Sequence, residues 1–404
     1  MRKLYVMLDE WNYNRVFIEK ELYLLRDKYD VTIICNDIPD SKIENIHYVT
    51  YTRKSSIYIL KALLRFAFDP DAWRELKLAS EARGNVKNKM SEVVRFYINA
   101  QLFYEFLCQN KLITNDSDAI YYSYWYFWKC FAITNHRSRH RNIKVLSRIH
   151  GYDLYNEQLP SGYQPFKKAM ENRLDKLVFI SEQGRDYYKN KFSGGTIDEE
   201  KCIISYLGTD NEYELKPYVR GDFFNLVSCS SLIELKQVDR IINALSMIDD
   251  VKVRWVHFGG GLLEDSIRQQ ASEMLSKKAN IEYEIKGHTP NAEVISYYAG
   301  NQIDAFITTS SNEGMPMSIM EALSFGIPVI ASPVGNIPNM IVTNGKVLKD
   351  NYSDADVAKA ISDMANMQQN DYMAMRNSAR LSWEEKYVAR KNFNSFVNDV
   401  VNNL

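Results

Sequence analysis

The chain has 404 residues, which is more than one hydrophobic core usually supports, so two domains are expected. Its 50 basic and 51 acidic residues leave a formal charge of −1, which excludes the strongly basic balance of a typical nucleic-acid-binding protein. The N-terminal apolar run is too short for a signal peptide, and no run of about 18 apolar residues follows. We therefore expect a cytoplasmic protein without a nucleic-acid partner. Any membrane contact would be peripheral, at the inner face.

Five cysteines occur without paired spacing, and several lie in apolar runs typical of strands. We expect reduced residues of the hydrophobic core at all of these positions: Cys35, Cys108, Cys130, Cys202 and Cys229.

The first half of the chain alternates short apolar runs with longer helical patterns. This alternation is typical of a parallel sheet covered by helices. We expect strands at residues 4–8, 31–35, 46–50, 119–123, 144–149 and 176–180. They predict a Rossmann-like domain over residues 1–214.

A long helical insertion, at about residues 55–112, interrupts this pattern. Its portion 53–95 carries ten basic and five acidic residues, with aromatic residues between them. One interpretation is a surface that meets an anionic lipid headgroup or a lipid-linked phosphate, and the other is a solvated helix face. Asp69 and Asp71 form a pair that could hold a divalent ion, but one pair without further oxygen ligands makes a poor site, so no metal is predicted.

A second alternating set follows a polar linker at residues 208–220. Its expected strands are residues 223–229, 252–258, 281–285, 303–307 and 327–331. We therefore expect a second doubly wound domain over residues 215–384, with a terminal helix over residues 385–404. Ligands of open α/β sheets bind beyond the carboxyl ends of the strands, so the loops that follow these strands are candidate sites.

The segment SNEGMPMSIMEALSFGIPVIAS, residues 311–332, places two carboxylates around the start of a short helix. Pro316 suits the first helical position and Gly326 suits the end, so Glu313 precedes the helix and Glu321 lies more than a turn inside it. Gly314 and the free amides that follow offer an anion site that a phosphate could occupy. The alternative is an ordinary helix start with a carboxylate near its favourable end.

In SSLIELKQVDRIINAL we expect a helix that begins near Lys236. A cation at a helix start is unfavourable unless an anion joins it, which suggests a bound phosphate with Arg240 one turn further on. The alternative is a neutral surface lysine.

His150 follows an expected strand and precedes a glycine. It could donate a hydrogen bond to a substrate oxygen, or it could satisfy local backbone groups. The glycines at 259–261 also close a strand and open a helix, as phosphate loops do, but they lack the GxGxxG and GKS/GKT patterns.

Taken in order, these segments resemble the retaining nucleotide-sugar glycosyltransferases of family four. The residues that carry the resemblance are the glutamate pair in SNEGMPMSIMEALSFGIPVIA with SPVGNIP, and HGYDLY, LIELKQVDRII, HFGGGLLED and KGHTPNAEVISYYAGNQIDAFI. The resemblance implies the α/β fold called GT-B, in which two facing Rossmann-like domains leave an interdomain cleft. It also implies that the first domain binds the acceptor and that the final helix returns to it.

The resemblance further implies roles for single residues. Glu313 would approach the donor sugar, Glu321 would hold the ribose, and Lys236 would meet the phosphates. His150 would lie across the cleft near the transferred sugar. The remaining residues that we assign to donor binding are Gly314, Met315, Pro316, Met317 and Ser318 through their amides, with Gly260, His288 and Arg240.

One departure concerns Ser231, which stands where such enzymes usually have an arginine. A phosphate cation is missing there, and its loss could weaken charge stabilisation by about 3 kcal/mol, the scale of one preorganised donor. Arg240 or a residue of the first domain would have to compensate.

The expected activity is metal-independent, retaining transfer of a hexose from a UDP- or GDP-sugar. The acceptor would be a glycan or a lipid-linked saccharide of a bacterial cell-surface polysaccharide. The donor is a substrate, and no cofactor is expected. The alternatives are a catalytically idle relative that binds nucleotide or a partner, and a GT-B sugar epimerase or phosphorylase.

Overall fold

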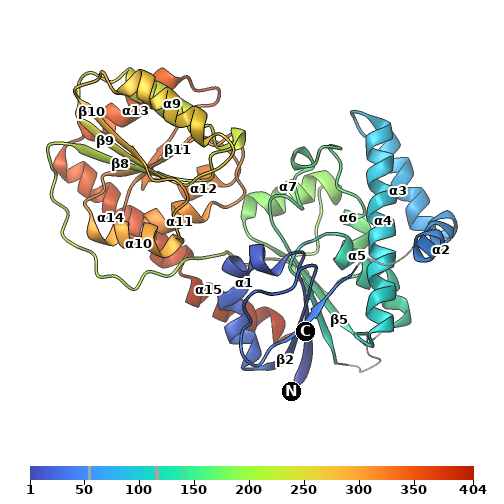
Figure 1. Ribbon diagram of the computed structural model, residues 1–404. Helices are drawn as coiled ribbons and strands as arrows, with labels where there is room; N and C mark the ends of the chain where they lie inside the picture. The colour runs from blue at the N-terminus through green and yellow to red at the C-terminus, as the bar shows by residue number, and fades with distance from the viewer. Residues whose placement is uncertain (53–55, 114–117, 141) are drawn as a thin grey trace. The chain divides into compact units, whose positions relative to one another are not determined.

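The computed structural model describes residues 1–52, 56–113, 118–140 and 142–404, and the chain divides into two compact units (Figure 1). The first unit consists of Met1–Tyr206 and Phe393–Leu404, and the second of Leu207–Asn392. The division after Tyr206 lies ahead of the expected domain start at residue 215. Contacts explain the difference, because Thr209 pairs with Val388 and the Trp383 indole donates a hydrogen bond to the Thr209 hydroxyl.

The first unit contains a seven-stranded parallel sheet in the order β3-β2-β1-β4-β5-β6-β7. The strands are β1 (Arg2–Met7), β2 (Tyr29–Cys35), β3 (His47–Thr50), β4 (Ile120–Ser123), β5 (Lys144–Ile149), β6 (Lys176–Phe179) and β7 (Cys202–Ile204). Six of them fall on the expected runs, and β7 was not expected. The chain order of the strands reverses between β1 and β4, which is the topological switch point of a doubly wound sheet.

Both faces of this sheet are buried, which is why its strands read as nearly continuous apolar runs. Tyr5 and Met7 of β1 pack into one core cluster, and Leu4 and Val6, which point to the opposite face, pack into another. The flanking helices include α1 (Trp11–Arg26), α5 (Trp128–His136), α6 (Lys167–Glu171) and α7 (Glu182–Phe192), and the short 3-10 turns are η1 (Arg137–Arg139) and η2 (Asn156–Gln158).

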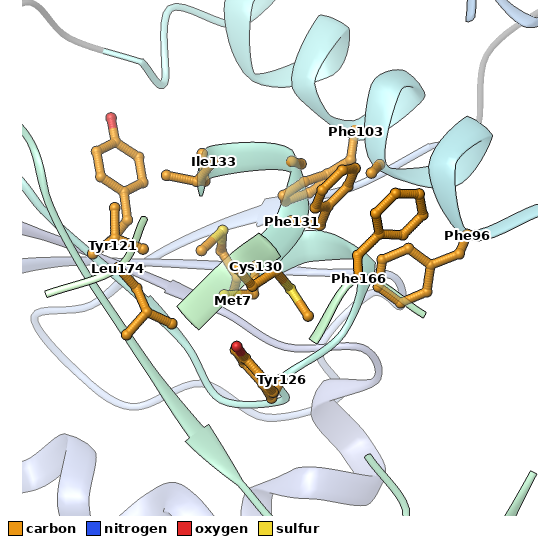
Figure 2. Packing of buried hydrophobic residues seen from close by; sticks show 14 of the residues in the cluster. Met7, Phe96, Phe103, Tyr121, Tyr126, Cys130, Phe131, Ile133, Phe166 and Leu174 are labelled. Atoms are coloured by element: carbon orange, nitrogen blue, oxygen red, sulfur yellow. The ribbon is translucent and has the colours of Figure 1, made fainter. Parts of the chain in front are cut away.

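The helical insertion consists of α2 (Ser56–Phe68), α3 (Pro70–Glu81) and the long helix α4 (Val86–Gln109), and residues 53–55 of the predicted basic stretch lie outside the described part. Helix α4 packs on α5 and also contacts α2 and α3 (Figure 1). Figure 2 shows Phe96 and Phe103 of α4 beside Phe131 of α5 and Phe166. The Phe131 and Phe166 rings stack with their centroids 4.3 Å apart. No helix in the described residues is both long and apolar enough to cross a membrane.

The aspartates weighed as metal ligands have structural partners. Asp69 caps α3 by accepting a hydrogen bond from the Asp71 amide at 2.9 Å, and it accepts another from the Tyr97 hydroxyl at 2.7 Å. Asp71 pairs with Arg74 and Arg173. These contacts account for both carboxylates as parts of the insertion's packing.

The C-terminal segment lies in two units. The expected helix over residues 385–404 is instead the end of α14 (Gln369–Lys386), then α15 (Ala389–Ser395), then a π-helical segment, η4 (Phe396–Val401). Four apolar residues of η4 are buried in the core of the first unit: Phe396, Val397, Val400 and Val401. The Tyr29 hydroxyl donates a hydrogen bond of 2.6 Å to Asn402.

The second unit contains a six-stranded parallel sheet in the order β10-β9-β8-β11-β12-β13. The strands are β8 (Phe224–Cys229), β9 (Val253–Phe258), β10 (Ile281–Ile285), β11 (Ala305–Thr308), β12 (Val329–Ala331) and β13 (Gly345–Val347). The helices that cover it are α8 (Asp239–Ser246), α9 (Glu264–Leu275), α10 (Asn291–Gly300), α11 (Met317–Ser324), α12 (Ile337–Met340), α13 (Asp354–Ala365) and α14. Strand β13 was not expected. The order reverses between β8 and β11, so this sheet also has a switch point.

The five cysteines are free. Cys35, Cys130 and Cys202 are buried, but Cys108 is exposed and Cys229 is only partly buried. The prediction of core positions for all five was therefore wrong for Cys108, which lies in the last turn of α4 and is not among the buried residues of that helix.

Candidate functional site

The candidate site of the second unit is built at the switch point between β8 and β11. At its centre, the Lys236 ammonium Nζ lies 2.6 Å from Glu313 Oε1. The two side chains are 21% and 12% exposed, so each charge is largely withdrawn from water and depends on the other. The structure thus brings together two residues that are 77 positions apart in the sequence.

The prediction that Lys236 lies in the first turn of a helix was wrong. It ends a short 3-10 turn, η3 (Glu234–Lys236), and Gln237 follows with a left-handed φ of 46°. Helix α8 begins only at Asp239. The left-handed residue breaks the helix path, so the charge of Lys236 is balanced by Glu313 and not set against a helix dipole.

The loops after β8 and β11 are tied to each other by hydrogen bonds. The Ser311 amide and hydroxyl both donate to the Leu235 carbonyl, at 2.8 and 3.1 Å. The Thr309 hydroxyl donates to the Gln237 carbonyl at 2.8 Å. These bonds hold the 3-10 turn of Lys236 against the loop of Glu313.

Gly335, in the loop after β12, supports Glu313 from another direction. Its φ is 55°, and a Cβ at this position would lie 1.6 Å from the Glu313 carbonyl oxygen. The neighbouring Asn336 amide donates to the Gly314 carbonyl at 3.3 Å. Only a glycine permits this close approach of two backbones.

Helix α11 begins one residue after Pro316, which occupies the N-cap. Its first turn has neither an acidic side chain nor a side-chain cap among the described residues, so amides at this end retain donor capacity. Met315 and Pro316 are buried, while Gly314, Met317 and Ser318 are partly exposed. The segment predicted to bind the sugar donor is therefore a short loop after Glu313 followed by the start of α11, which suits an anion.

Glu321 lies in the second turn of α11, and its Oε1 accepts a hydrogen bond of 2.8 Å from the Asn291 side chain. Asn291 is the first residue of α10 and was not among the predicted site residues. Its position at a helix start after β10 was the only signal in the sequence that could have identified it.

The glycine-rich loop after β9 packs against the loop after β8. A Cβ on Gly259 would lie 1.9 Å from the Ser230 carbonyl oxygen. A Cβ on Gly261 would lie 2.6 Å from the Leu232 carbonyl oxygen. A Cβ on Gly260 would lie 3.1 Å from the His288 amide nitrogen. The structure therefore brings the predicted residues Gly260 and His288 together, with the His288 side chain exposed.

Arg240 takes a structural position instead of the predicted place beside a phosphate. Its Nε donates to Asp354 Oδ1 at 2.8 Å, its Nη2 donates to the Tyr352 carbonyl at 2.6 Å, and its guanidinium stacks on the Tyr352 ring at 3.9 Å. The Tyr352 hydroxyl in turn donates to the Thr309 carbonyl at 3.0 Å. Arg240 therefore supports the loop after β11 through Tyr352.

His150, in the first unit, follows β5 and is buried. Its backbone amide donates to Asp153 Oδ1 at 2.6 Å, and its ring lies 4.8 Å from the Tyr124 ring and 4.5 Å from the Trp125 ring. Neither ring nitrogen has a hydrogen-bond partner among the described residues. Burial lowers the pKa of His150, so the ring is neutral and can still form a hydrogen bond to a ligand.

Solved GT-B glycosyltransferases share this fold of two doubly wound units over the whole chain. The lipopolysaccharide outer core galactosyltransferase WaaB superposes with a TM-score of 0.68 at 15% identity, covering 100% of both chains. Anabaena HepE, solved in complex with UDP and glucose, superposes with a TM-score of 0.64 at 14% identity, also covering 100% of both chains. The predicted GT-B fold is confirmed.

The second unit also matches a family model. Residues 216–382 match the model of the glycosyl transferases group 1, and this range lies within the second unit. The O-antigen biosynthesis glycosyltransferase WclY of Escherichia coli is 26% identical over 213 residues, which are 48% of this chain and 54% of WclY. The chain spans about half the length of the curated relatives it matches. The resemblance to bacterial polysaccharide glycosyltransferases is confirmed.

Proposed function

We propose that this chain transfers a hexose from a UDP- or GDP-sugar to a glycan or lipid-linked saccharide during synthesis of a bacterial cell-surface polysaccharide. The observation that carries the proposal is the ion pair between Lys236 and Glu313 at the switch point of the second sheet. The family model that the second unit matches and the UDP and glucose bound to HepE also support it.

In this proposal, Lys236 and the amides at the start of α11 neutralise the nucleotide diphosphate as it leaves. Without ligand, Glu313 balances the ammonium charge of Lys236. When the diphosphate binds, its oxygens take over that role, and the carboxylate of Glu313 is released to accept hydrogen bonds from the sugar hydroxyls. Glu321, positioned by Asn291, accepts hydrogen bonds from the ribose. The charge compensation that the mechanism needs thus comes from residues of the chain itself.

The transfer proceeds with retention of the anomeric configuration. The acceptor hydroxyl attacks the anomeric carbon on the face from which the diphosphate departs. The bond from that carbon to the phosphate oxygen breaks, the new bond to the acceptor oxygen forms, and the hydroxyl proton passes to the departing phosphate. His150 donates a hydrogen bond from its neutral ring to an oxygen of the transferred sugar.

The experiment measures nucleotide release by the purified chain from a panel of UDP- and GDP-sugars, with membrane extract as the acceptor source. We expect Glu313→Ala to lower the rate by about 100-fold or more, the scale of losing one preorganised transition-state contact. Glu284→Ala is the matched control, because Glu284 of β10 forms an ion pair of the same 2.6 Å length with Lys286 and is 56% exposed. Thermal unfolding of each variant reports whether it remains folded.

The proposal fails if the wild-type chain consumes no donor, or if Glu313→Ala and wild type release nucleotide equally fast. Ser231, an exposed residue, favours the second candidate, a catalytically idle relative, because a serine cannot neutralise phosphate. Turnover by the purified chain excludes that candidate. Sugar NMR of the product separates transfer from epimerisation or phosphorolysis.

A further inference from the structure

Helix α2 of the first unit presents an apolar stripe to solvent. The buried residues of this helix are Ala62 and Phe66. On the opposite side, four large apolar residues recur at the spacing of one helix face. They are exposed by 55 to 84%: Ile57, Leu60, Leu64 and Phe68. Scattered single apolar residues are normal on a surface, but an aligned stripe of this length marks an interaction site.

The charges of the insertion are sorted between its outside and its inside. The side chains of Arg74 and Arg95 are 71% and 66% exposed, whereas their partners Asp71 and Glu92 are only 13% and 12% exposed. Glu75 is also buried, and its carboxylate accepts a hydrogen bond from Tyr163. Glu81 is an exception, since it is 60% exposed, and Lys89 is a buried cation. Exposed cations therefore outnumber exposed carboxylates in the described part of the insertion.

Further cations lie on or next to α2, which contains no acidic residue. Lys61 is exposed within the stripe itself, and Arg83 and Lys87 are exposed near the start of α4. The described part of the insertion thus offers an apolar face within a positive electrostatic surface.

An open groove of about 590 Å³ lies between α2, α3 and α4. Apolar side chains dominate its walls, and Lys87 and Arg95 also line it. The apolar wall residues are Ile59, Leu76, Met90, Val94 and Ile98. Apolar walls beside two cations match an acyl chain that carries an anionic headgroup.

We propose that the insertion docks on an anionic phospholipid bilayer, with α2 parallel to the surface and its apolar stripe at the boundary between headgroups and acyl chains. The exposed cations contact the headgroups. Charge complementarity favours a bilayer over a second copy of this chain, because an isologous pairing would place the same cations opposite each other. The proposal does not depend on which donor the second unit binds.

The test is co-sedimentation of the full chain with vesicles of phosphatidylcholine alone and of phosphatidylcholine with phosphatidylglycerol. We expect binding to the anionic vesicles, and about tenfold or greater weakening in the double variant Leu64→Ser with Phe68→Ser, since each substitution removes apolar area that the bilayer would bury. Leu381→Ser is the matched control: Leu381 is 54% exposed on α14, against 55% for Leu64, and we expect its binding to equal that of wild type.

Three results would overturn the proposal. They are no binding to the anionic vesicles, equal binding by the double variant and wild type, and a vesicle-independent dimer that the double variant abolishes, which would assign the stripe to a second copy. The same variants are assayed for nucleotide release with a soluble acceptor. We expect wild-type rates there, so a failure of membrane docking is distinguishable from a failure of the proposed transferase activity.

Discussion

At the scale of the residue, the arrangement of the site depends on which anion balances the positive charge of Lys236. A cation that is only 21% exposed needs an anionic partner, and in the described structure that partner is Glu313 at 2.6 Å. A phosphate oxygen at the same place would satisfy the ammonium equally well. We therefore interpret the ion pair as the unliganded arrangement of a residue that binds anions.

Buried His257, in β9, makes the stability of the second unit depend on pH. Its Nδ1 lies 2.8 Å from the Ser228 hydroxyl, and burial lowers its pKa from 6.5 to about 4. Between these two values the unfolded chain binds more protons than the folded one, so stability is lost as the pH falls below 6.5. At about pH 5 this histidine should cost about 2 kcal/mol relative to neutral pH.

The measurement compares the free energy of unfolding of wild type and His257→Asn at about pH 7.5 and about pH 5, on either side of the unfolded histidine pKa. Burial raises the pKa of Asp304, so Asp304 contributes more stability as the pH falls, which is opposite to His257. Asp304 is present in both proteins, so the difference between them isolates His257. Wild type should lose more stability than the variant on acidification. Equal losses would show that folding does not lower the pKa of His257.

The site residues that could be predicted from the sequence are those that belong to a short local pattern. Glu313 and Glu321 flank a helix start marked by Pro316, and that pattern is visible within a dozen residues. Asn291 and Asp354 were not predicted, because their partners are 30 and 114 positions away and no local pattern reports such contacts.

At the scale of the element, the site depends on loops that pack without space between their backbones. The loop after β12 reaches the loop after β11 only because position 335 carries no side chain. The start of α11 is thus held in place by an element that provides none of the predicted ligands.

Gly335→Ala should therefore displace the Glu313 loop. A Cβ would lie 1.6 Å from the Glu313 carbonyl oxygen, so we expect a stability loss of about 2 kcal/mol or more and weaker donor binding. Gly162→Ala is the control, because Gly162 has a comparable φ of 65° with nothing within 4 Å of its Cβ, and its backbone strain alone should cost about 1 kcal/mol. Thermal unfolding measures both. Equal shifts for the two variants would rule out a steric role for Gly335.

The pattern of the elements also explains which parts of the fold the sequence could reveal. Long buried strands such as β5 and β9 read as continuous apolar runs and were predicted. Strands β7 and β13 have three residues each and lie at the sheet edges, so their apolar pattern is too short to recognise. The start of α8 was misplaced because the left-handed Gln237 separates it from Lys236, and a residue other than glycine gives no signal of that conformation.

At the scale of the whole molecule, the chain returns to its first unit after completing the second. Phe396 of η4 is buried there, and the Arg148 guanidinium lies 4.4 Å from the centroid of its ring. Arg148 in turn pairs with buried Glu21 at 2.8 Å. The last residues thus complete a core that the first 206 residues leave open.

Phe396→Ala should destabilise the first unit by about 3 to 5 kcal/mol, the usual cost of deleting a fully buried phenylalanine ring. Phe68→Ala is the control in the same unit, since Phe68 is 84% exposed and its loss should change stability by less than about 0.5 kcal/mol. Denaturant unfolding with proteolysis would identify the unit that opens first. If Phe396→Ala unfolds like wild type, the C-terminal segment is not part of that core.

The central claim is that the second unit binds a nucleotide sugar, with Glu321 contacting the ribose and Glu313 contacting the transferred sugar. Isothermal titration with UDP, GDP and ADP tests it most directly in wild type, Glu321→Gln and Glu313→Gln. One of these nucleotides should bind wild type, and Glu321→Gln should weaken it by about 10- to 100-fold, the range for losing a charged hydrogen bond. Glu313→Gln should bind it at least as tightly as wild type, because the Glu313 carboxylate, which competes with the diphosphate for Lys236, is gone. Equal weakening in both variants, or no binding by wild type, would contradict the account.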